Sequence, residues 1–158
     1  MKIEVTEDIK QVDVSPGTYR AQCVGAIIGT TLPYLSTDEA ERYAAVQFKF
    51  RVYTKTGEEL EIFSAPAKIP TRYHSGYNFF KVISALWGTD INPGDVVELP
   101  DFDEDELPLF FTKGEKMKEL SYIKVNGINV LDASAIIKVS MNQSGTRTKV
   151  SEVLSIPD

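Results

Sequence analysis

Residues 43–54, YAAVQFKFRVYT, alternate along their whole length between two kinds of side chain. A period of two predicts a β-strand that sends the two sets to opposite faces of a sheet. The expected core face consists of Ala44, Val46, Phe48, Phe50 and Val52. The other face consists of Tyr43, Ala45, Gln47, Lys49, Arg51 and Tyr53. Its two cations between two aromatic rings suit the binding of a charged, stackable polymer such as single-stranded nucleic acid.

The segments that flank this strand predict two neighbouring strands. Residues 18–31 are rich in β-forming residues, and Gly25 and Gly29 within them mark a bulge or a sharp bend. The turn KTGE at 55–58 leads into ELEIFSA at 59–65, which predicts a hairpin. We therefore expect three consecutive strands in this half of the chain.

The second arm of the hairpin limits what the first arm can bind. Leu60 and Ile62 are expected to face the core, whereas Glu59, Glu61 and Phe63 share the outer face with the cations of the first arm. Cross-strand pairing can neutralise those cations, while Phe63 adds a third ring. Two interpretations stay open. Either the rings stack on bases, or they pack under loops while the cations pair with the two glutamates.

The rest of the chain predicts one helix and further strands. Residues 77–87, YNFFKVISALW, place apolar side chains three and four positions apart, as an amphipathic helix does, and Gly88 ends the segment. A short strand is expected at 96–99, and a last hairpin at 136–141 and 149–156. The main elements are therefore three strands, a helix and two strands.

An acidic insertion is expected at about residues 100–135, before the last hairpin. Residues 101–106, DFDEDE, are densely acidic, and Asn126-Gly127 is a strong type I′ hairpin signal. The chain has a net charge of −6, and residues 89–135 alone carry eleven Asp and Glu against four Lys and Arg. Because local charge decides whether a surface attracts phosphate, the acidity of this region does not exclude a phosphate-binding surface elsewhere.

Length and composition indicate one folded domain. The 158 residues are 42% hydrophobic and 25% charged, which is enough to bury a core. The N-terminus lacks the apolar core of a signal peptide and no apolar run approaches the length of a membrane span, so we expect a cytoplasmic protein. The single cysteine, Cys23, is expected to be a buried apolar filler.

Motifs for catalysis or metal binding are not recognised in the sequence. Asp101, Asp103 and Asp105 have the spacing that begins an EF-hand loop, but its later positions do not fit. The sixth position is Glu106 where glycine is needed, and the twelfth is Thr112 where glutamate is needed. One histidine and one cysteine cannot make an ordinary zinc site. We therefore expect a protein that is not an enzyme and takes no cofactor or metal.

The predicted order of elements is that of the OB-fold, a five-stranded, partly open Greek-key barrel. The chain also resembles phage-encoded single-stranded DNA-binding proteins of the OB-fold type. The resemblance is carried by PGTYRAQCVGA (16–26), VQFKFRVYTKTGEEL (46–60), SGYNFFKVISALWG (75–88) and, weakly, IIKVSMNQSGTRTKVSEVL (136–154). It implies a mainly β OB-fold-like barrel with a helix between the third and fourth strands. Residues 100–135 have no counterpart in this family, so we expect one OB-fold-like domain over residues 1–158 that carries an inserted β-hairpin.

For function, the resemblance implies cooperative, sequence-tolerant binding of single-stranded DNA in phage replication or recombination, in the cytoplasm of a bacterial host. Aromatic rings would stack on bases and cations would meet phosphates. The predicted nucleic-acid-binding residues are Tyr43, Lys49, Arg51, Tyr53, Phe63, Arg72, Tyr73, Lys138, Arg147 and Lys149. The sequence leaves open whether the protein is a homo-oligomer and whether it prefers DNA or RNA.

An alternative hypothesis is a non-enzymatic OB-like scaffold or interaction protein. Its acidic loop would bind a basic phage or host protein of replication or recombination. The residues that would make this contact are Asp101, Asp103, Glu104, Asp105 and Glu106.

Overall fold

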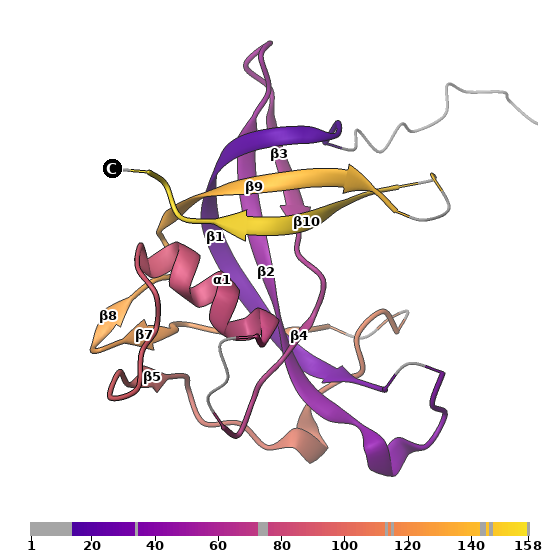
Figure 1. Ribbon diagram of the computed structural model, residues 1–158. Coiled ribbons are helices and arrows are strands. Elements are labelled where there is room, and N and C mark those ends of the chain that lie inside the picture. The colour runs from indigo at the N-terminus through magenta and orange to yellow at the C-terminus, as the bar shows by residue number, and fades with distance from the viewer. Residues whose placement is uncertain are drawn as a thin grey trace, which may run out of the picture.

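The computed structural model describes residues 14–33, 35–72, 76–112, 114, 116–142, 145 and 147–157 (Figure 1). Its elements in chain order are β1 (Gly17–Thr31), η1 (Glu39–Glu41), β2 (Tyr43–Tyr53), β3 (Glu59–Phe63), β4 (Ala67–Lys68), α1 (Asn78–Trp87), β5 (Val97–Glu98), η2 (Glu104–Glu106), β6 (Lys118–Glu119), β7 (Lys124–Val125), β8 (Ile128–Asn129), β9 (Ser134–Met141) and β10 (Thr148–Leu154). The prediction of a mainly β chain with one α-helix is confirmed.

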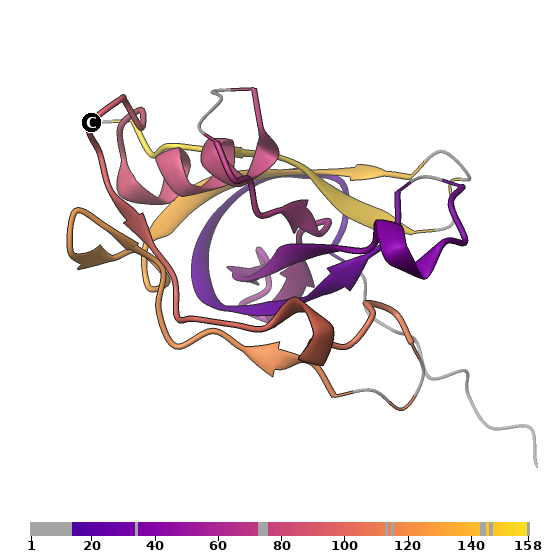
Figure 2. The ribbon, with the colours of Figure 1, turned by 90° about the horizontal axis from the view of Figure 1, so that it is seen from below.

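The main sheet has the strand order β10-β9-β1-β2-β3, with β4 paired to β2 and β6 paired to β1. The sheet curls strongly, as the view in Figure 2 shows, but it is not closed into a barrel. No ladder between β3 and β10 is found in the described part of the chain. The five-stranded OB-fold barrel therefore stays a prediction, and β4 and β6 are strands that the sequence did not predict.

The core of this sheet follows the alternation of β2. Val46, Phe48, Phe50 and Val52 are fully buried, and Ala44 is 2% exposed, so the predicted core face is confirmed. Leu60 and Ile62 of β3 are partly buried and pack against the same core, as expected. From α1, the side chains of Phe79, Val82, Ile83, Ala85 and Leu86 are buried. The β2 pattern therefore fixes which side of the sheet is closed to solvent.

Strand β1 is long enough to pair with β9 near its start and with β2 along most of its length. The register of the β1–β2 ladder shifts between Cys23 and Gly25, so the predicted bulge lies at the first glycine. Gly29 serves a different purpose. A Cβ atom there would lie 2.9 Å from the Pro108 carbonyl oxygen and 3.1 Å from a ring carbon of Phe110. Glycine at this position therefore allows residues 108–110 to approach the strand.

Strand β3 ends at Phe63, two residues before the predicted end. The Ser64 hydroxyl accepts a hydrogen bond from the Phe48 amide (3.0 Å), and the Ser64 amide donates to the Phe48 carbonyl (2.8 Å). Pro66 follows, which has no N–H for a ladder. Side-chain capping and a proline thus stop the strand.

Helix α1 begins after Tyr77 and ends at Gly88, which has φ 95° and donates its amide hydrogen to the Ser84 carbonyl (2.9 Å). Glycine is favoured there because this left-handed conformation is costly for other residues. The predicted helix end is confirmed. Among the described residues, no helix has both the length and the apolar character needed to cross a membrane.

The insertion before β9 is part of the folded core. Its hairpin, β7 and β8, turns at Asn126 (φ 49°) and Gly127 (φ 82°), the two positive φ values of a type I′ turn, so the predicted hairpin is confirmed. Strand β5 adds a third strand to it. The insertion contributes to the hydrophobic core the side chains of Leu107, Leu120, Ile123, Val125, Val130 and Leu131. It is therefore not a separable appendage.

Cys23 is fully buried in β1, as predicted. Burial raises the pKa of its thiol from 9.0 to about 11, against a smaller lowering by the hydrogen bond to the Gly25 carbonyl. The folded protein therefore keeps the thiol protonated at pH values where an unfolded chain has lost the proton.

We expect the folded state to lose stability at alkaline pH because of Cys23. Its contribution is complete below pH 9, the unfolded value, and is lost as the pH rises toward about 11. By roughly pH 10.5 the loss is about 2 kcal/mol, since one pKa unit corresponds to about 1.4 kcal/mol. Urea denaturation below pH 9 and at about pH 10.5 would measure this loss of stability, with Cys23→Ala as the reference that lacks the thiol. Equal pH dependence in the two proteins would contradict the assignment.

Candidate nucleic-acid interface

The outer face of the β2–β3 hairpin brings together four of the predicted residues. Lys49, Arg51 and Tyr53 alternate on β2, and Phe63 of β3 pairs directly with Lys49. Tyr53 is 62% exposed and Phe63 is 42% exposed. The hairpin extends beyond its neighbours at the top of Figure 1, so its outer face is open to a ligand.

Both cations of this face are paired with carboxylates of β3. Lys49 Nζ lies 2.8 Å from Glu61 Oε2, and Arg51 Nε lies 2.6 Å from Glu59 Oε1. Lys49 also lies over the Phe63 ring, 5.8 Å from its centroid. The expected pairing of the two cations with Glu59 and Glu61 is therefore confirmed. The other half of that interpretation does not hold for Tyr53, which is exposed and does not pack under a loop.

The pairing of Arg51 is imperfect. Although its Nε atom is close to Glu59, this atom is buried and makes no hydrogen bond with any described group. The second contact, from a terminal nitrogen to Glu61, is 3.9 Å long. Because Nε is buried, its charge is compensated by Glu59 within the hairpin, and a ligand oxygen cannot reach this atom.

Tyr43 does not join the predicted residues of the hairpin face. Between Tyr43 and Lys49 the outer face of β2 is closed, with Ala45 fully buried and Gln47 only 9% exposed. Tyr43 is half-buried and has the Lys68 ammonium 5.2 Å from its ring centroid. Arg72 is exposed in the segment that follows β4, at some distance along the chain from the hairpin, and Tyr73 lies outside the described residues.

The insertion is what closes this part of the face. The Pro108 carbonyl accepts a hydrogen bond from the Thr30 amide (2.8 Å), and the Phe110 amide donates to the Thr30 carbonyl (2.9 Å). Gly29, which pairs with Ala45, is in contact with this segment and with Met117. The predicted stripe of β2 is thus divided, and only its Lys49–Tyr53 end remains open.

The predicted cations of the last hairpin lie away from the β2–β3 face, with β9 two strands and β10 three strands from β2 in the sheet. Lys138 of β9 pairs across the ladder with Glu152, with 3.3 Å between Nζ and Oε2. Lys149 and Arg147 are exposed and form no ion pair with the described residues. These two side chains are therefore available to phosphate, whereas Lys138 is partly neutralised.

Arg20 is a candidate that sequence reasoning missed. It precedes Ala21, which pairs with Val52, so Arg20 lies next to Tyr53 on the outward side of β1. It is exposed and has no ion pair among the described residues. The alternation of β1 could have identified Arg20 from the sequence. Tyr19, Ala21 and Cys23 face the core, so Thr18, Arg20 and Gln22 face outward.

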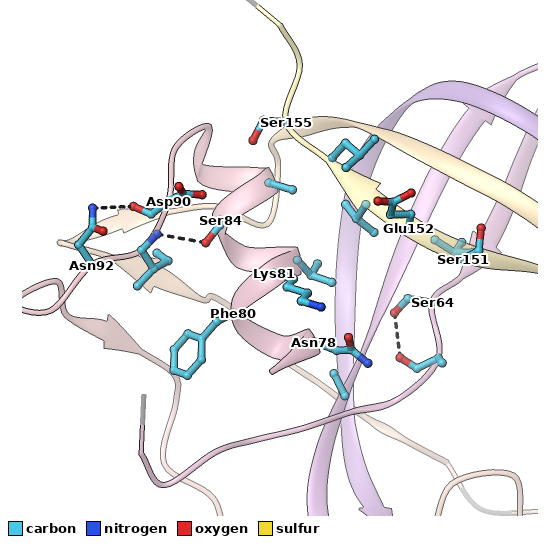
Figure 3. Close-up of a pocket in the computed structure, with 18 residues that line it drawn as sticks. Ser64, Asn78, Phe80, Lys81, Ser84, Asp90, Asn92, Ser151, Glu152 and Ser155 are labelled. Carbon is cyan, nitrogen blue, oxygen red and sulfur yellow. Dashed lines mark hydrogen bonds between the residues drawn. The ribbon is translucent and has the colours of Figure 1, made fainter. Parts of the chain in front are cut away.

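A groove of about 660 Å³ lies elsewhere, along α1. Figure 3 shows Asn78 and Lys81 of the helix on one side and Ser151 and Glu152 of β10 on the other, with Ser64 nearby. The groove lies where β3 and β10, the two ends of the strand path, are not paired. It contains none of the predicted nucleic-acid-binding residues.

The acidic residues of the alternative hypothesis lie on and before η2. Asp103 caps this turn by accepting a hydrogen bond from the Asp105 amide (3.0 Å). All five predicted residues, Asp101, Asp103, Glu104, Asp105 and Glu106, are exposed and make no ion pair with the described part of the chain. Within that part, no three His, Cys, Asp or Glu side chains are grouped in a way that could hold a metal ion.

The outer face of β1, β2 and β3 thus offers two exposed rings, two compensated cations and one uncompensated arginine within one continuous ladder. Such a surface can stack on planar groups and accept anionic oxygens. Comparison of the chain with protein-family models, with curated proteins and with solved structures finds no match.

Proposed function

We propose that the protein binds single-stranded DNA on the outer face of the β2–β3 hairpin, without sequence readout along most of the strand. The observation that carries this proposal is the pair of exposed rings, Tyr53 and Phe63, at the two ends of the hairpin ladder. Tyr53 lies four positions along β2 from Lys49, the partner of Phe63, so the rings lie about 13 Å apart along the strands. Lys49 lies opposite Phe63, and Arg51 lies between the two rings.

The strand arrangement supports an OB-type scaffold for this face. The five long strands and the helix occur in the order β1, β2, β3, α1, β9 and β10, and β1 lies between β2 and β9 in the sheet. In our proposal this path is a barrel left open between β3 and β10. Nucleic-acid ligands of OB-folds use the face of the second and third strands, which here are β2 and β3.

The charges of the face make stacking the main source of affinity. Glu59 and Glu61 already compensate the two β2 cations, so phosphates must compete for them. Away from the hairpin, Arg20 on β1 and Arg147 and Lys149 at β10 are exposed and form no ion pair with described residues, so they can meet the phosphates of a strand that continues across the sheet.

Anisotropy titration of a labelled oligo-dT tests the proposal. We expect binding with a weak salt dependence. Three engaged cations give a slope of log K against log salt of about −2, because each contributes roughly −0.7 on single strands. Raising the salt from about 50 to about 200 mM should then lower the affinity roughly 20-fold.

Three outcomes of this titration would count against the proposal. Absence of binding at the lower salt concentration would exclude single-stranded DNA as the ligand. A slope near zero would remove the role of the cations, and a much steeper slope would mean that electrostatics rather than stacking dominates.

A further inference from the structure

A small hollow opens on the outer face beside the proposed DNA-binding ladder. It has a volume of about 200 Å³ and is lined by residues of β1, β2, β3 and β6. Its floor is Gly25 and Ile27 of β1, and Phe63 and Lys49 form the wall on the β3 side. On the other side lies Glu119 of β6, which pairs with Ile27 and therefore points to the same face.

The backbone explains why this space is empty of side chains. A Cβ atom at Gly25 would have no neighbour within 4 Å, and the bulge at this glycine interrupts the regular alternation of β1. Leu120, the residue that follows β6, is buried and its amide donates to the Ala26 carbonyl (2.9 Å). Strand β6 is thus held firmly against β1, so the wall that carries Glu119 is fixed.

The three polar and aromatic groups around the hollow match a nucleobase. The Phe63 ring, 42% exposed, offers a stacking surface, and the Lys49 ammonium lies over this ring, 5.8 Å from its centroid. Glu119 is exposed and forms no ion pair with a described residue, so its carboxylate can accept hydrogen bonds. A carboxylate accepts but does not donate. It therefore favours a base edge with adjacent N–H donors.

Among the bases, guanine has the edge that fits this requirement. Its N1–H and its N2 amino group lie side by side and can bind the two oxygens of one carboxylate. Thymine presents a single N3–H between two carbonyl oxygens, which a carboxylate repels. Adenine and cytosine place an unprotonated ring nitrogen next to their amino group. The carboxylate thus distinguishes guanine from the other three bases by donor geometry.

We propose that the hollow between Phe63 and Glu119 is a single-base site that prefers guanine. This proposal rests on the proposed single-stranded DNA binding, and adds one position of base preference to an otherwise sequence-tolerant surface. Glu119 is the residue that determines the preference, whereas Phe63 contributes to binding of any base.

Competition between two oligonucleotides of equal length tests the base site, one of oligo-dT and one with a single central dG. We expect the wild-type protein to bind the dG-containing strand roughly fivefold or more tightly, the lower end of the discrimination that a bidentate contact provides. Strands with a central dA or dC should bind like oligo-dT. In Glu119→Gln the ratio of the two dissociation constants should fall to about one, because an amide presents one acceptor and one donor.

Glu106→Gln is the matched control, because it removes the same charge from an exposed glutamate on η2 and leaves the hollow intact. It should keep the preference for dG. Equal affinity of the wild-type protein for the two strands would overturn the base site while leaving DNA binding in place. A preference that survives in Glu119→Gln would also overturn it. Failure of both strands to bind would overturn the proposed function and the base site together.

Discussion

Replacing Phe48 by alanine is expected to lower the free energy of unfolding by about 3–5 kcal/mol, the usual cost of truncating a buried phenylalanine. Phe48 is fully buried at the centre of β2, and its backbone amide is bonded to the Ser64 hydroxyl. The loss combines the transfer free energy of the ring with the cavity left among the side chains of two strands and a helix. Urea denaturation followed by circular dichroism would measure it.

Phe111→Ala is the control for this experiment. Phe111 is 80% exposed, in a left-handed conformation with φ 64°, so truncating its ring removes little buried surface. Its free energy of unfolding should stay within about 0.5 kcal/mol of that of the wild type. If the two variants were destabilised equally, the assignment of the β2 core face would be wrong.

Local patterns in the sequence predicted much of this fold. The alternation of residues 43–54 placed Phe48 and Phe50 in the core, and Asn126-Gly127 placed a type I′ turn. Both signals are short-range: strand alternation sets the face of each side chain, and two positive φ values restrict the residues of a turn. For the same reason the cross-strand pairing of Lys49 with Glu61 could be foreseen from the hairpin.

Contacts between segments far apart in the sequence could not be predicted from such local patterns. Nothing in residues 43–47 indicates that the insertion will cover Ala45 and Gln47, because the covering segment is more than 60 residues away in the sequence. The contact depends on Gly29 and on hydrogen bonds from Thr30 to residues 108 and 110. Tyr43 was therefore grouped with Tyr53 although the folded chain separates them.

The packing of the insertion into the core decides which variants can test whether the acidic turn binds a partner. Leu107 and Leu120, which border residues 108–119, are both buried in the core. Arg42 also ties the insertion to the β1–β2 end, since its guanidinium donates to the Leu107 carbonyl (2.9 Å). Deleting residues 101–119 would therefore damage the core. Substitutions that neutralise the exposed carboxylates leave these contacts in place.

The variant that combines Tyr53→Ala with Phe63→Ala is expected to lower the affinity for oligo-dT by about 30- to 700-fold. Each base–aromatic contact is worth roughly 1–3 kcal/mol, and the exposed position of both rings favours the lower half of this range. Because the rings lie about 13 Å apart along the ladder, their effects should add. Two losses of about 1–2 kcal/mol then give the stated range, at about 1.4 kcal/mol per tenfold change.

Salt dependence separates this stacking loss from a loss of charge. Both substitutions leave Arg20, Arg147 and Lys149 in place, so the plot of log K against log salt should shift downward with its slope unchanged. Tyr77→Ala is the matched control, because Tyr77 is 48% exposed at the start of α1, away from the β2–β3 face, and its removal should leave the affinity unchanged. An unchanged affinity in the folded double variant would exclude stacking on this face. If the salt dependence also became weaker in the double variant, the rings would act by holding cations in position rather than by stacking on bases.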